Sequence, residues 1–155
     1  GVVWAFTSND SFVNGALYIF YVVIIANLGF IIRSFFSFIF LAKMVTQNVL
    51  FCGVSLYLLI GNIFTPTYLL LNVLVENFTG ADAFGIHTYD VSITWQRMYY
   101  LSFTVLTTLG FGDITPVSSF VEPFVLAEAG IGVLYMAIFM ARLVSLYETQ
   151  RSGIV

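Results

Sequence analysis

Charged residues are scarce in this sequence: they make up 8% of its 155 residues, whereas about 25% is usual in soluble globular domains. A water-exposed surface cannot be assembled from so few charges, so the composition excludes an ordinary soluble protein. The net charge is −3 and the five basic residues are scattered along the chain, which excludes nucleic-acid binding through a basic surface. The single cysteine, Cys52, cannot form a disulfide within the chain.

Groups that perform catalysis or bind metals are also rare. There is one histidine and one cysteine, and no spacing typical of metal ligands, so we expect neither an enzyme nor a bound cofactor. One rival hypothesis is an intramembrane enzyme in which Glu128 and His87 act as acid–base groups. A second rival is a structural membrane protein without transport activity. No segment has arginine at every third position, so this sequence contains no voltage sensor.

Long apolar stretches are what the sequence does have, since 60% of its residues are hydrophobic. A membrane-spanning helix needs about 20 mostly apolar residues, and residues 12–32, 49–75 and 120–146 meet that requirement. Arg33 closes the first stretch, and the aromatic-rich residues after it predict a separate helix at the membrane interface. We therefore expect an N-terminal span with its interfacial segment over residues 1–46 and a second unit over residues 47–155.

The region between the second and third spans has mixed character. Residues 76–94 are polar and are expected to form an exposed loop. Residues 95–107 are amphipathic and too short to cross a bilayer, which predicts a re-entrant helix. The predicted fold is therefore an all-α integral membrane protein, in which an outer span, a short half-helix, an extended glycine-containing segment and an inner span follow one another.

The charges are distributed unevenly about these spans. Arg33 and Lys43 precede the second span, and Arg142 and Arg151 lie at the end of the third. The connection between the two spans carries four acidic residues and one arginine, Arg97, and a fifth acidic residue, Glu122, lies in the first turn of the third span. Basic flanks stay in the cytoplasm. The connection is therefore expected to face the outside of the cell.

Within this connection lies the motif Thr-Leu-Gly-Phe-Gly-Asp, residues 108–113. Stripping water from an alkali ion requires a ring of oxygens to replace it, and backbone carbonyls serve only if consecutive ones point the same way. An ordinary strand alternates its carbonyls. Turning them all to one side requires left-handed conformations at alternate residues, which glycine adopts without cost. Gly110 and Gly112 have the required spacing of two.

This motif resembles the selectivity filter of tetrameric potassium channels, usually Thr-Val-Gly-Tyr-Gly-Asp, and the chain is most similar to small bacterial members of that family. The resemblance covers residues 49–146 and implies a homotetramer around a central pore in a lipid bilayer, placed in the cell membrane and specifically the bacterial inner membrane. It implies passive, selective conduction of K+, with no cofactor and no nucleic-acid partner. The alternative is a less selective monovalent cation channel. The ion-binding residues that the resemblance implies are Thr108, Leu109, Gly110, Phe111 and Gly112, of which the first four are the K+ ligands.

Two departures from the family pattern affect the surroundings of the filter. Phe111 replaces a tyrosine whose hydroxyl tethers the filter to the re-entrant helix in many relatives, and Val105 stands where the family usually has threonine. Both substitutions predict fewer hydrogen bonds behind the filter. Asp113 follows the filter, where it either adds negative potential at the outer mouth or hydrogen-bonds to the backbone behind the filter.

The third span is expected to line the cavity below the filter. Val133, Met136, Met140 and Val144 recur at spacings of three and four, so they share one helix face. This stripe either lines the pore and contains its gate or packs on the second span.

Two further features of the third span leave alternatives open. Gly132 stands where relatives have a hinge glycine, although close helix packing is a competing explanation. Glu128 lies about two turns into the span, where an ionised carboxylate is costly, so we expect it to be protonated or hydrogen-bonded behind the re-entrant helix. His87 is either an extracellular pH sensor or an ordinary surface histidine. The sequence does not indicate the gating stimulus.

Overall fold

The computed structural model describes residues 2–41, 46–86 and 93–152, so His87 and Lys43 lie outside the described residues. Over these ranges the chain forms four helices and a two-stranded sheet, which confirms the predicted all-α membrane class. The elements are α1 (Val2–Leu41), α2 (Gln47–Thr79), β1 (Phe84–Ile86), α3 (Trp95–Leu106), β2 (Ile114–Pro116) and α4 (Glu122–Ser152).

All three predicted spans are long apolar helices. The segments able to cross a membrane are Gly15–Ile39, Gln47–Thr79 and Glu122–Glu148. The predicted break at Arg33 is wrong, because α1 continues through it to Leu41 as one helix. The reason is local: the residues after Arg33 contain neither proline nor glycine, so nothing ends the helix there. At about 1.5 Å per residue, α1 is about 60 Å long, twice the thickness of the hydrocarbon core.

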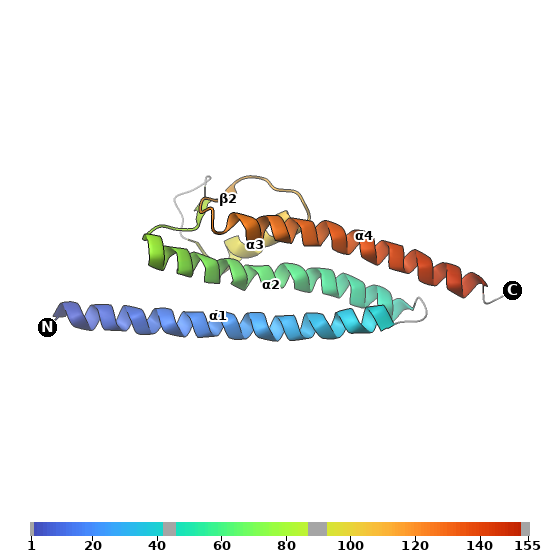
Figure 1. Cartoon of the computed structure of the whole chain (residues 1–155), viewed down its shortest axis with the longest axis horizontal. Coiled ribbons are helices and arrows are strands. Elements are labelled where there is room, and N and C mark those ends of the chain that lie inside the picture. The colour runs from blue at the N-terminus through green and yellow to red at the C-terminus, as the bar shows by residue number, and fades with distance from the viewer. Residues whose placement is uncertain (1, 42–45, 87–92, 153–155) are drawn as a thin grey trace.

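The three long helices lie side by side in Figure 1, with α2 between α1 and α4 and in contact with both. The short helix α3 contacts α2 and α4 near one end of the bundle, where the sheet also lies. The end of α1, the start of α2 and the end of α4 all lie at the opposite end. Arg33 lies in the last quarter of α1 and Arg142 in the last third of α4, so these two basic residues lie toward the end of the bundle away from the motif.

The small sheet is a feature that the sequence analysis did not predict. Strands β1 and β2 pair antiparallel, with Phe84 opposite Pro116 and Ile86 opposite Ile114. Phe84 and the preceding Ala83 are buried in the core with residues of α2 and α3, so this part of residues 76–94 is not an exposed loop. The sheet joins the chain that leaves the motif to the chain that approaches α3. It therefore holds both ends of the α3–motif unit together.

Candidate ion-conduction site

The end of α3 positions the backbone of the motif. A helix leaves its last four carbonyl groups without partners inside the helix, and here each of them accepts a hydrogen bond. The amides of Thr107 and Thr108 donate to the carbonyls of Phe103 and Val105, at 3.1 and 2.9 Å. The Tyr57 hydroxyl on α2 donates to the Leu106 carbonyl at 3.1 Å. The fourth carbonyl, that of Thr104, receives amides from the motif itself.

Three alternate residues of the motif have a left-handed backbone. The φ angle is 60° at Thr108, 51° at Gly110 and 78° at Gly112. The sequence analysis predicts this conformation for the two glycines, and the structure agrees. Thr108 was not predicted, because a positive φ is uncommon outside glycine and carries strain that the surrounding hydrogen bonds must hold.

The amides of Leu109 and Gly110 both donate to the Thr104 carbonyl, with N···O distances of 2.8 and 3.2 Å. The peptide bonds are trans, so the C=O of each peptide group points opposite to its N–H. The carbonyls of Thr108 and Leu109 therefore both point away from the end of α3. Two consecutive carbonyls on the same side of the chain are the arrangement that an ordinary strand cannot provide.

Tyr100 of α3 contacts two side chains of the motif, Phe111 and Asp113. The ring of Phe111 lies nearly parallel to that of Tyr100, with 6.3 Å between centroids and 6° between planes. The Tyr100 hydroxyl also donates a hydrogen bond to the Asp113 carboxylate. Partial burial, this hydrogen bond and the negative charge of Asp113 together raise the pKa of Tyr100. Asp113 is thus held by a side chain of α3, a partner that sequence reasoning missed.

The predicted stripe on α4 lies on the face turned away from α2. Its four side chains are 47–56% exposed. At about 100° per residue, they lie on average about 125° around the helix from Tyr135 and Phe139. Those two residues face α2: the Tyr135 hydroxyl donates to the Gly53 carbonyl at 2.6 Å, and the Phe139 ring occupies the space beside Gly53. Packing of the stripe on α2 is therefore ruled out within one chain.

Gly132 is a point of close approach between α4 and the end of α3. A Cβ atom placed there would lie 2.3 Å from the Leu106 carbonyl oxygen, whereas a Cβ on Gly130 would meet nothing within 4 Å. Close packing therefore explains the glycine at 132 but not the one at 130. The proposed hinge at Gly132 stays a prediction, since α4 is continuous through both positions.

Glu128 is fully buried, at 0% exposure, where α2, α3 and α4 meet. The Tyr68 hydroxyl of α2 donates to one carboxyl oxygen, and the other lies 2.5 Å from the Ser102 hydroxyl of α3. Ser102 also lies 2.7 Å from the Gly61 carbonyl, which can only accept. A serine hydroxyl has a single proton. Every contact in this cluster is satisfied when Ser102 donates to Gly61 and a protonated Glu128 donates to Ser102.

A protein-family model described as an ion channel matches residues 44–149. The chain belongs to this ion channel family. No curated protein matches the chain, and no solved structure does. The match covers α2, α3, the motif and most of α4, whereas α1 lies outside it.

The structure of the channel separates the residues that the sequence analysis singled out. The motif is one continuous segment held by α3, and the stripe lies on the exposed face of α4. Glu128 lies on the opposite face of α4 and is closed in by Tyr68 and Ser102. It therefore touches neither the stripe nor a surface open to a substrate.

The close approach at Gly132 gives a stability prediction for the channel. Gly132→Ala is expected to lower the stability of the folded protein by about 1–3 kcal/mol, because the rigid Leu106 carbonyl has to move. Gly130→Ala is the matched control and is expected to be neutral or slightly stabilising, since nothing lies near its Cβ. Thermal unfolding of both variants in the same detergent measures the difference. Equal unfolding temperatures would contradict the close approach.

The contact between Tyr100 and Asp113 gives a prediction about the motif. Tyr100→Phe removes the hydroxyl that holds Asp113, so current through the channel is expected to decay several-fold faster during sustained recording. The neighbouring Tyr99→Phe serves as the control, because the Tyr99 ring packs on Phe103 rather than on Phe111. Single-channel recording in planar bilayers gives the decay rates. The same decay in both variants would show that the Tyr100 hydroxyl does not support the motif.

Proposed function

We propose that the channel conducts potassium ions selectively, as a homotetramer in the cell membrane, and that residues 108–112 form its selectivity filter. The observation that carries this proposal is the pair of adjacent carbonyls, from Thr108 and Leu109, that point away from α3. The left-handed Gly110 and Gly112 allow the carbonyls of Gly110 and Phe111 to continue the same row. Asp113 stands at the outer mouth, and the organism implied by the resemblance is bacterial.

Oxygens arranged in this way perform the chemistry that ion selection requires. One chain supplies one carbonyl to each level of the row, and four chains around an axis complete a ring of four oxygens at each level. Such rings replace the hydration shell of K+. The Thr108 hydroxyl adds an oxygen at the inner end. No protein group changes its charge or forms a covalent bond, so the process is passive.

The exposed surface of the single chain supports assembly around an axis. Leu109 and Phe111 are 62% and 66% exposed, although both are large apolar side chains in the motif. In a tetramer they pack against neighbouring copies, which wedges the filter. The exposed stripe of α4 then lines the cavity below the filter. The C-terminal end of α3 carries a partial negative charge of about half a unit, which favours a cation in that cavity.

Reversal potentials test this function directly. With K+ on one side of a bilayer containing the purified channel and Na+ on the other, the reversal potential is expected to follow the potassium gradient. A reversal potential near zero would instead support the second candidate, a less selective monovalent cation channel. Phe111 and Val105 lack the hydroxyl groups that relatives place behind the filter, which affects the rigidity of the filter more than its ion preference.

A further inference from the structure

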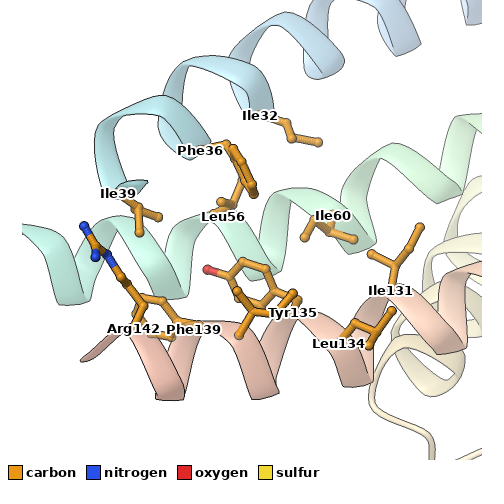
Figure 2. Close-up of a pocket in the computed structure, with 11 residues that line it drawn as sticks. Ile32, Phe36, Ile39, Leu56, Ile60, Ile131, Leu134, Tyr135, Phe139 and Arg142 are labelled. Carbon is orange, nitrogen blue, oxygen red and sulfur yellow. The ribbon is translucent and has the colours of Figure 1, made fainter. Parts of the chain in front are cut away.

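A cavity of about 220 Å³ lies between α1, α2 and α4, on the side of α4 away from the stripe. Figure 2 shows its walls: Ile32, Phe36 and Ile39 reach in from α1, Leu56 and Ile60 from α2, and a row of residues from α4. The α4 residues recur at spacings of three and four, so they share one face of the helix: Ile131, Leu134, Tyr135, Ile138, Phe139 and Arg142. They face about 180° away from the stripe. The cavity is therefore separate from the proposed conduction path.

The lining of this cavity is almost entirely hydrocarbon. A cavity of roughly 150 Å³ lined by leucine, isoleucine and phenylalanine stays dry and takes up small apolar molecules, because water finds no hydrogen-bond partners there. The cavity here is larger, and all three of its walls belong to segments that can cross a membrane. The substance available to fill such a space inside a bilayer is the acyl chain of a lipid.

One charged residue, Arg142, completes the lining. Figure 2 places it at the end of the cavity farthest from α3, beside Ile39 and Phe139. Basic residues collect at this end of the bundle, which the charge pattern assigns to the cytoplasm. An arginine guanidinium binds a phosphate group through two parallel hydrogen bonds. Basic pockets between spans on the cytoplasmic side are suited to the head groups of acidic lipids.

From this combination we infer that the cavity binds an anionic phospholipid, with one acyl chain between α1 and α4 and its phosphate on Arg142. The site requires α1, which lies outside the segment matched by the ion channel family, so the pore unit alone does not form it. The lipid would join α1 to the inner helix α4, and its presence would then influence how freely α4 moves. This inference concerns lipid binding and does not depend on which ion is conducted.

Native mass spectrometry of the purified channel tests the inference without measuring ion flux. The channel is equilibrated with mixed vesicles of phosphatidylglycerol and phosphatidylcholine, extracted, and examined for retained lipid. The wild-type channel is expected to retain phosphatidylglycerol severalfold over phosphatidylcholine, because both lipids carry a phosphate but the choline ammonium of phosphatidylcholine cancels the net negative charge that favours binding beside Arg142. Arg142→Gln is expected to bring this ratio close to one. Arg33→Gln is the control, since Arg33 is exposed on α1 and does not line the cavity.

Filling the cavity tests where the acyl chain lies. Leu134→Trp and Ile138→Trp each place a bulky ring in the cavity, and both are expected to lower retention of either lipid severalfold. Equal retention of the two lipids by the wild-type channel would overturn the inference, and this comparison needs no variant to fold. Loss of preference in Arg33→Gln as large as in Arg142→Gln would also overturn it, because diffuse charge would then explain the binding. So would undiminished retention in both tryptophan variants.

Discussion

Replacing Gly112 by alanine is expected to abolish potassium flux, by more than about a hundredfold, while the protein still folds and assembles. Nothing lies within 4 Å of a Cβ at this position, so the effect is not a collision within the chain. It comes from the φ angle of 78°, which costs an L-residue about 1–2 kcal/mol. Each of the four copies carries this strain, so the conducting backbone is destabilised by about 4–8 kcal/mol in each tetramer.

The structure provides a matched control for this substitution. Gly80 ends α2 with a φ angle of 72°, and a Cβ there also meets nothing within 4 Å. Gly80→Ala therefore introduces the same kind of strain at a helix end away from the motif, and it is expected to leave conduction unchanged. Flux of K+ into vesicles, compared at equal amounts of assembled protein, measures both variants. If Gly112→Ala conducts as well as Gly80→Ala, the left-handed backbone of the motif is not required for conduction.

Replacing Glu128 by leucine is expected to destabilise the folded channel and, as a result, to reduce conduction. Leucine removes both carboxyl oxygens, leaving the hydroxyl of Tyr68 without its acceptor and that of Ser102 without one of its partners. Ser102 still donates to the Gly61 carbonyl, so the Tyr68 hydroxyl is the group left unsatisfied, at a cost of about 1–3 kcal/mol for each chain. The three helices that hold the motif meet at this point. Thermal unfolding and vesicle flux are measured on the same preparations.

Glu128→Gln is the control that separates structure from acid–base chemistry. The glutamine amide donates to Ser102 and its carbonyl oxygen accepts from Tyr68, so it reproduces the bonds of a protonated glutamate. We expect nearly wild-type unfolding temperature and flux. An intramembrane enzyme using Glu128 as its acid or base predicts the reverse, since glutamine cannot exchange a proton. Loss of activity in Glu128→Gln with unchanged stability would contradict the structural role.

The parts of the fold that could be predicted are those with long or distinctive patterns. The apolar stretches are each longer than a bilayer requires, so the three spans follow from length and hydropathy alone. Helix α3 was placed within one residue, because residues 95–107 are amphipathic and end before the motif. The left-handed backbone at residues 110 and 112 could be predicted because both are glycines, and few other residue types adopt that conformation.

The remaining features depend on contacts between distant residues. Strands β1 and β2 have three residues each, too few for alternation to be visible, and their paired residues lie 28 to 32 positions apart in sequence. The partners of Glu128 lie 60 and 26 residues away in sequence. Arg33 suggested the end of a span, but a single charge does not stop a helix that nothing else interrupts. The tie between Tyr100 and Asp113 depends on how the motif folds back along α3.

An experimental structure of the assembled channel, grown with rubidium or thallium in place of potassium, tests the central claim most directly. The anomalous signal of these ions marks their positions. We predict a fourfold assembly with a row of ions on its axis, each surrounded by backbone carbonyls of residues 108–111 from four chains. A monomeric or dimeric particle, or an axis without ions beside these carbonyls, would contradict the account.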